Sequence, residues 1–282
     1  MEVKMNADMV QKMKNFLDVL GLPEEPMGVY YTDEAPAESI SPKPLDLPTR
    51  EKEAANQIDW QTIFSNFSCV IGNIWRARKK KVPAVFDSAR FGCPGGAFFL
   101  GFMKPQTNTI IHYVSSGVPG QMEGELYCES PEALGKIFDY IDPPTAREKY
   151  CVVKPISRFT GGEQPELVAF FTRPESLCGL HQLASFVTND PEVVVSPWGA
   201  ACTNLITWPM KFLRAGENKA VLGGWDPSAR KFFKTDELSF TVPYGMFLDM
   251  LDRFEDSFLK THTWEIVRKK ISRSRKIWGE ED

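Results

Sequence analysis

The stretch FGCPGGAFFLGF at residues 91–102 places a cysteine directly before a proline, two glycines and an apolar run. Proline is favoured in the first turn of a helix, so the pattern predicts that Cys93 opens a helix that runs to about residue 102. The free N–H groups of a helix N-terminus lower the pKa of a nearby thiol and favour anions. The stretch therefore predicts a cysteine-lined site, and it leaves the reaction unnamed.

Two further cysteines have similar surroundings. Cys69 lies in NFSCVIGN at residues 66–73, and Cys202 lies in WGAACTN at residues 198–204. In both segments the neighbours of the cysteine are small or typical of turns. Because small residues let the backbone approach a bulky ligand, the two segments are suited to surround a cofactor.

Thiolates bind zinc and iron–sulfur clusters, and the ligands can come from distant segments of the chain. Three cysteine ligands leave one coordination position open, which catalysis requires. We therefore predict one site formed by Cys69, Cys93 and Cys202, with Gly95 and Gly96 close to the cofactor. The expected cofactor is an iron–sulfur cluster or zinc, in a redox or substrate-binding role.

Two other interpretations of these cysteines stay open. Free cysteine is often buried as a small hydrophobic residue, so the three could pack in the core, or one of them could be a single reactive thiol. The remaining cysteines lie in apolar helix or strand patterns and are expected in the core: Cys128, Cys151 and Cys178.

A second function class is a metal-free module that binds a small molecule or a partner in an aromatic cleft. Trp198, Trp208 and Trp225 lie near glycine turns and are candidates for its walls. Asp226 is expected to cap a helix, with Arg230 one turn later as its ion-pair partner or as an anion-binding residue.

Composition limits the remaining classes. The 282 residues are 43% hydrophobic and 25% charged, with a net charge of −4, which argues against a general nucleic-acid binder. The first ten residues do not have the apolar core of a secretion signal, and no apolar run is long enough to cross a membrane. We therefore expect a cytoplasmic protein with reduced cysteines. A third function class is an interaction protein that binds RNA or anionic lipid through the basic residues at 76–81 and 268–276.

Motifs for common chemistries are missing from the sequence. It contains no glycine-rich loop for binding nucleotides, no zinc-protease helix and no nucleophile elbow. It also contains no C-x-x-C motif, in which two residues separate a pair of cysteines. The chain has three histidines, so a histidine-rich metal centre is excluded. The pattern leaves open whether the protein is an enzyme, as well as its oligomeric state.

Periodicity predicts an α+β protein with mixed sheets covered by helices. We expect a single domain over residues 1–282, with two similar halves, 1–145 and 146–282, as an alternative division. Val29-Tyr30-Tyr31-Thr32 and Ala169-Phe170-Phe171-Thr172, each followed by a proline, suggest such a repeat. Helices are expected at 6–20, 58–80, 130–141 and 244–276, and another opens at Pro174 and includes Val187. Strands are expected at 27–32, 82–86, 109–114, 151–156, 166–172, 193–196, 220–222 and 238–242.

The order of several short motifs resembles the prokaryotic family called domain of unknown function 169, over nearly the whole chain. The motifs are FSC at 67–69, CPGGA at 93–97, LG at 100–101, VAFF at 168–171, GAAC at 199–202, AVLG at 220–223 with Asp226 and Arg230, DE at 236–237 and VP at 242–243. The resemblance implies a protein of bacteria or archaea, often anaerobes, which suits oxygen-sensitive cysteine chemistry. It implies no particular reaction.

Overall fold

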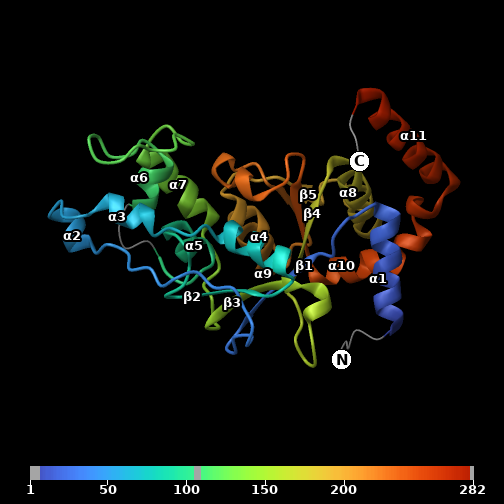
Figure 1. The fold of residues 1–282 in the computed structure, drawn as a ribbon, viewed down its shortest axis with the longest axis horizontal. Coiled ribbons are helices and arrows are strands. Elements are labelled where there is room, and N and C mark those ends of the chain that lie inside the picture. The colour runs from blue at the N-terminus through green and yellow to red at the C-terminus, as the bar shows by residue number, and fades with distance from the viewer. Residues whose placement is uncertain (1–6, 105–108, 280–282) are drawn as a thin grey trace.

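The computed structural model describes residues 7–104 and 109–279, and in this part of the chain seven strands form one sheet (Figure 1). The strand order is β2-β3-β1-β4-β7-β6-β5, and neighbours are antiparallel except for the parallel pair β5 and β6. The strands are β1 (Met27–Thr32), β2 (Ala84–Asp87), β3 (Tyr150–Pro155), β4 (Leu167–Thr172), β5 (Val194–Val195), β6 (Ala220–Gly223) and β7 (Leu238–Pro243). This mixed sheet with helices confirms the predicted α+β class.

Helices cover both faces of the sheet. The first face carries α4 (Val70–Lys80), α5 (Pro94–Phe99), α6 (Thr109–Val114), α7 (Pro131–Ile141), and a π-helix (Thr203–Thr207) that continues into α9 (Trp208–Arg214). The second face carries α1 (Ala7–Leu20), α8 (Pro174–Thr188) and α10 (Tyr244–Arg253). Short 3₁₀ turns lie at Ile156–Arg158, Pro227–Phe232, Phe254–Asp256 and Phe258–Lys260.

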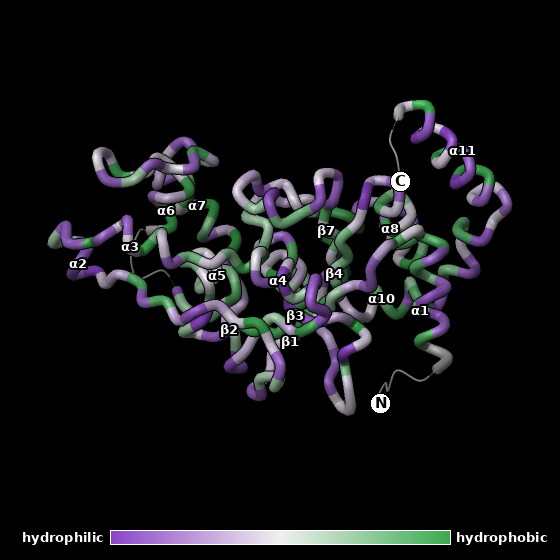
Figure 2. The backbone as a smooth tube through the Cα atoms, viewed as in Figure 1, coloured by the Kyte–Doolittle hydropathy of each residue, from purple (hydrophilic) through white to green (hydrophobic). Residues whose placement is uncertain are grey.

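The remaining helices lie at the two ends of the molecule. In Figure 1, α2 (Arg50–Ala54) and α3 (Trp60–Ser65) lie at one end, and α11 (His262–Trp278) lies at the other. Figure 2 shows that α2 and α11 are mostly hydrophilic, whereas hydrophobic residues concentrate in the strands and the helices packed on them. In the described part of the chain, no helix combines the length and the apolarity needed to cross a membrane.

The central strand β4 explains how the sheet separates two hydrophobic cores. Its six residues are all buried, because alternate side chains enter opposite cores. Val168 and Phe170 pack with α1, α8 and α10, whereas Ala169 and Phe171 pack with the helices of the first face. The continuous apolar run that predicted this strand is typical of a strand covered on both sides.

Two expected elements differ in the structure. The helix predicted over residues 58–80 is divided into α3 and α4, because Asp59 caps the first helix and the chain leaves helical geometry before Cys69. The strand predicted at 109–114 is helix α6. A short apolar run fits either structure, and here the helix places Ile110 in the first core.

One expected core residue is exposed. Cys178 lies on the outward side of α8, since its neighbours Gly179 and Leu180 form the buried face of that helix. Cys151 is buried as expected, and Cys128 packs against the first core from a partly exposed position. The prediction for Cys178 was therefore wrong.

Two sets of three strands pair in the same order, one set in each part of the chain. β1 pairs with β3, which pairs with β2; β4 pairs with β7, which pairs with β6. A division at residue 145 would place β3 in a different half from β1 and β2, between which it lies. A duplication of the chain and a single domain over 1–282 both stay predictions.

Candidate functional site

The three predicted cysteines line one cavity on the first face of the sheet. Cys69, Cys93 and Cys202 come from segments far apart in the sequence and surround a space of about 110 Å³. Each lies at the start of a helix: Cys69 before α4, Cys93 before α5, and Cys202 before the π-helix. The cavity also has an apolar wall that includes Phe99 and Ile110.

Backbone contacts join the first two cysteine segments. The N–H of Ser68 donates to the carbonyl of Gly92 over 2.8 Å. Gly92 has a φ of +84°, and a Cβ atom there would lie 2.1 Å from the carbonyl oxygen of Ser68. The residues directly before Cys69 and Cys93 therefore lie side by side only because residue 92 is a glycine.

The third cysteine segment is fixed by two polar side chains. The hydroxyl of Thr207, on the π-helix, donates to the carbonyl of Phe99 at the end of α5 over 2.8 Å. The N–H of Ala201 donates to Asp226 Oδ2 over 3.1 Å, and Asp226 Oδ1 accepts from the N–H of Ser228. Asp226 thus caps the 3₁₀ turn as predicted and also positions the backbone next to Cys202.

The two predicted glycines have different roles. Gly95 lines the cavity, and its missing side chain leaves room for Ile110. Gly96 lies behind Cys93: its N–H donates to Cys93 Sγ over 3.3 Å, and an added Cβ would lie 2.1 Å from the carbonyl oxygen of Phe91. The close approach that Gly96 permits is therefore to the protein's own backbone.

The cavity favours protonated thiols when no cation is present. Burial raises the pKa of Cys69, although the N–H groups of Gly72 and Ile71 lower it in part. Burial also raises the pKa of Cys93 to about 12 and that of Cys202 well above its ordinary value. The charges of the neighbouring thiolates and of Asp226 shift the pKa of Cys202 in the same direction.

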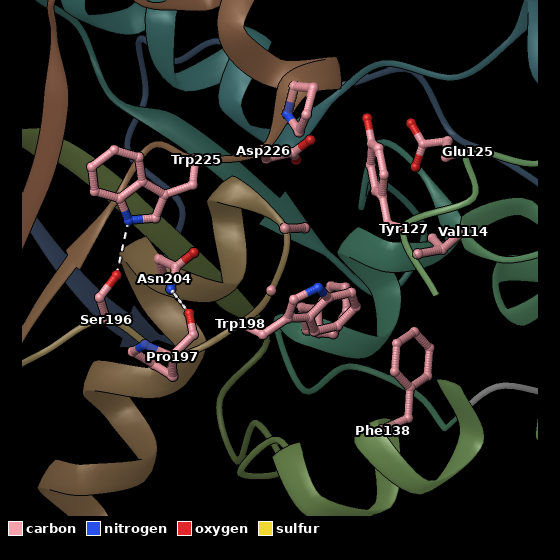
Figure 3. Close-up of a pocket in the computed structure, with 14 residues that line it drawn as sticks. Val114, Glu125, Tyr127, Phe138, Ser196, Pro197, Trp198, Asn204, Trp225 and Asp226 are labelled. Atoms are coloured by element: carbon pink, nitrogen blue, oxygen red, sulfur yellow. Dashed lines mark hydrogen bonds between the residues drawn. The ribbon is translucent and has the colours of Figure 1, made fainter. Parts of the chain in front are cut away.

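A larger pocket adjoins this thiol cavity. Its volume is about 480 Å³, and it shares Phe99, Val114, Glu125, Ala200 and Asp226 with the walls of the cavity. Figure 3 shows Trp198 and Phe138 on one side of the pocket and the oxygens of Glu125, Tyr127 and Asp226 along another. The two spaces therefore lie next to each other and share one wall, and together they are the candidate site.

Two carboxylates give the pocket its charge. Burial and the negative charge of Asp226 raise the pKa of Glu125, whereas hydrogen bonds with Ser228 and Tyr113 lower it in part. Burial and the charge of Glu125 raise the pKa of Tyr113 to about 12, and Cys93 contributes in the same direction. The acidic groups, the tyrosine and the thiols are therefore electrostatically connected.

The aromatic residues named from the sequence are only partly at the pocket. Trp198 and Trp225 line it, and Trp225 Nε1 donates to Ser196 Oγ over 2.8 Å (Figure 3). Trp208 is buried beneath the pocket wall, where its Nε1 donates to the carbonyl of Trp198 over 2.9 Å. Trp208 supports the position of Trp198 and does not line the pocket.

The expected role of Arg230 was wrong. Its guanidinium donates to four carbonyl oxygens, those of Gly224, Lys234, Thr235 and Glu237, and it does not pair with Asp226. Arg230 therefore holds the turn between β6 and β7. In the basic segment at 76–81, Arg78 is buried in an ion pair with Glu237, so it supports the fold and is not presented to a partner.

No sequence pattern indicated Glu125, Tyr113 or Tyr127 as residues of the site. They lie on or after α6, in a region whose pattern predicted a strand and gave no helical periodicity. An isolated glutamate in a loop has no local signal that could reveal its approach to Asp226, which lies 101 residues later in the sequence.

The metal prediction has no direct geometric support. Within residues 7–104 and 109–279, no group of three or more His, Cys, Asp or Glu side chains is placed to hold a metal ion. The thiols share a cavity without forming a tight ligand set. Zinc bound by cysteine requires Zn–S distances of about 2.3 Å, so its sulfur ligands lie within about 4 Å of one another.

The sequence was compared with known protein families, curated proteins and solved structures. Residues 15–253 match domain of unknown function 169, described as uncharacterised ArCR. The chain belongs to this family. No curated protein and no solved structure gives a match.

Proposed function

We propose that this member of the domain of unknown function 169 family binds an iron–sulfur cluster through Cys69, Cys93 and Cys202, next to a small-molecule pocket. The observation that carries the proposal is the meeting of three distant cysteines, each at the start of a helix, on one cavity. Core packing alone would not require three helix starts to face the same space.

The size of the cavity favours a cluster over a single ion. One water molecule takes about 30 Å³ of liquid, so 110 Å³ exceeds the space of an ion with one water ligand. In a [4Fe–4S] cluster each cysteine binds a different iron atom, so the cysteine sulfur atoms lie farther apart than around one zinc ion. Thiols that share a wall without forming a compact set suit the cluster better.

The surroundings of the sulfur atoms also support this proposal. Cys93 Sγ accepts a hydrogen bond from Gly96 N–H, and Cys69 interacts with the N–H groups of Ile71 and Gly72. Hydrogen bonds to cysteine sulfur tune the reduction potential of a cluster. A bound cluster would supply electron transfer or an open iron position, and the chain's own residues would hold and orient the substrate beside it.

Charge gives a further reason for a cationic cofactor. Three thiolates beside Asp226 would repel one another, and the raised pKa values of the thiols reflect this cost together with burial. Metal cations displace the protons of cysteine ligands and compensate the thiolate charge. The site thus has ligands that become stable as thiolates when a cation is bound.

The proposal is tested by anaerobic purification, with reconstitution by iron and sulfide, followed by visible absorption and analysis of iron and acid-labile sulfide. We expect broad visible absorption and a stoichiometric cluster in the native protein. Each of Cys69→Ser, Cys93→Ser and Cys202→Ser should lose most of the iron and sulfide together. Cys178→Ser is the matched control, because this cysteine is exposed on α8, and it should keep the full content.

Other results would contradict the cluster. Stoichiometric zinc without sulfide, lost in the same three variants, would replace the cluster by a zinc site. Three independent, small effects of the substitutions would show that the cysteines do not act together.

A second candidate is a metal-free binding module, and the pocket of about 480 Å³ with its aromatic walls favours it. Under this alternative the thiols are packing residues and the pocket alone carries the function. A colourless protein without metal after reconstitution, whose tryptophan fluorescence responds to a small molecule, would support it.

A further inference from the structure

The larger pocket combines aromatic walls with a negative charge. Phe99, Phe138, Tyr127, Trp198 and Trp225 contribute five aromatic rings. Trp198 and Trp225 are 40% and 52% exposed, so their rings are accessible to a ligand. A volume of about 480 Å³ lies in the range of pockets that hold small organic ligands.

All charged side chains on the pocket wall are acidic. Glu125 and Asp226 line it, and the other lining residues with polar groups are neutral: Tyr127, Ser196, Trp198, Asn204 and Trp225. In the described part of the chain, no Lys, Arg or His lines this pocket or the adjoining thiol cavity. The positive charge of Lys231 lowers the pKa of Glu125 in part, and Lys231 is exposed and does not line either space.

This pattern excludes most anionic ligands. A phosphate or carboxylate would meet two carboxylates and would leave water without gaining a cationic partner, which carries a large desolvation cost. A ligand with an ammonium group would instead gain charge-assisted hydrogen bonds to the carboxylates. The faces of Trp and Tyr rings also attract cations, and a planar body can pack against the same rings.

We propose that the pocket selects a small organic cation, an amine with an apolar or aromatic body, whose ammonium group lies between Glu125 and Asp226. This inference deepens the proposed function and rests on it only for the view that the pocket is the substrate site. The thiol cavity lies directly beyond the carboxylates, because Glu125 and Asp226 line both spaces. The charged end of the ligand would therefore point toward the cysteines.

Of the two carboxylates, Glu125 is the better one to test. Asp226 accepts hydrogen bonds from Ala201 and Ser228, so its replacement would also disturb the backbone near Cys202. Glu125 lies in the loop between α6 and α7, and its side chain forms hydrogen bonds with the side chains of Ser228 and Tyr113. Glu125→Gln preserves the shape and removes the charge.

The experiment compares three probes of nearly equal size: phenethylamine, 3-phenylpropionate and 2-phenylethanol. Their binding is measured by calorimetry and by tryptophan fluorescence, on the protein as purified and on the Cys93→Ser variant. We expect phenethylamine to bind at least tenfold more tightly than the neutral and the anionic probe. Glu125→Gln should weaken phenethylamine at least fivefold and leave phenylethanol unchanged.

Glu123→Gln is the matched control, because Glu123 is exposed in the same loop and does not line the pocket. It should bind phenethylamine like the native protein. Equal or tighter binding of 3-phenylpropionate would overturn the proposal, and so would the absence of phenethylamine binding at millimolar concentration. Amine binding that persists in Cys93→Ser would show that the pocket does not need the cluster. Amine binding by a native protein that holds no cluster after reconstitution would uphold the pocket and refute only the cofactor.

Discussion

At the scale of single residues, the thiol of Cys93 makes the stability of the metal-free protein depend on pH. Burial raises its pKa from an ordinary value of 9.0 to about 12. The folded state therefore keeps a proton that the unfolded chain loses between these values. The resulting stabilisation is fully present below about pH 9, and it falls as the pH rises toward 12.

We predict that the free energy of unfolding of the metal-free protein decreases from pH 8 to pH 10.5. Each thiol whose pKa is raised in the folded state contributes up to about 1.4 kcal/mol per pH unit to the slope of the free energy of unfolding. Cys93→Ala should make this slope smaller, whereas Cys178→Ala should leave it unchanged. Urea denaturation at several pH values, under reducing conditions, measures the slopes; equal slopes for the native protein and Cys93→Ala would contradict the prediction.

The sequence predicted that Cys69, Cys93 and Cys202 come together, and they line one cavity, whereas their role as ligands stays a prediction. Small neighbours selected Cys69, Cys93 and Cys202, because glycine and alanine mark places where backbone segments approach closely. The same reasoning could not predict Glu125, because the position of this residue depends on how the loop after α6 packs against the turn at Asp226. Such contacts are set by tertiary structure and have no local pattern.

At the scale of secondary-structure elements, the packing of α5 depends on Gly96. A methyl group at this position would lie 2.1 Å from the carbonyl oxygen of Phe91 and 2.8 Å from Val70 Cγ2. Gly135 in α7 is a matched helical glycine, because an added Cβ would meet no atom within 4 Å. The same substitution at the two positions should therefore have opposite effects.

We predict that Gly96→Ala lowers the free energy of unfolding by about 2 kcal/mol or more, as expected for overpacking against rigid backbone. Gly135→Ala should raise it by about 0.5–1 kcal/mol, since alanine restricts the unfolded chain and favours the helix. Urea denaturation at neutral pH distinguishes the two. Tolerance of Gly96→Ala with unchanged stability would show that α5 can move away from Phe91.

The elements differ in how well they could be predicted. The helix at α7 was found with its cap, because Ser130, Pro131 and an amphipathic pattern all indicate the same structure. The π-helix at Thr203–Thr207 was missed, since its apolar residues follow the short strand β5 without a helical start signal. An element could be predicted where several local sequence signals indicated the same structure.

At the scale of the whole molecule, a buried ion pair connects α4 to the turn before β7. Arg78 Nη2 lies 2.8 Å from Glu237 Oε1, and Arg78 Nη1 lies 3.1 Å from Glu237 Oε2. The two side chains are 7% and 4% exposed, and the guanidinium carbon lies 3.7 Å from the centre of the Phe171 ring. The pair thus joins segments on both sides of the middle of the sheet, where β1 meets β4.

We predict that Arg78→Met lowers the free energy of unfolding by about 3–5 kcal/mol, because it leaves the carboxylate of Glu237 buried without its guanidinium partner. The double variant Arg78→Met, Glu237→Leu should recover most of this loss, since two apolar residues replace the pair without a buried charge. Lys12→Met is the control: Lys12 pairs with the exposed Asp252, and its loss should cost at most about 1 kcal/mol.

The same denaturation experiment tests whether residues 1–282 form one unit. Both hydrophobic cores contain residues from before and after residue 145, so unfolding of one part exposes the apolar surface of the other. Tryptophan fluorescence and circular dichroism should therefore report one shared transition, in the native protein and in Arg78→Met alike. Two separate transitions, with only one shifted by the substitution, would show instead that the chain contains two units and that the pair stabilises only one of them.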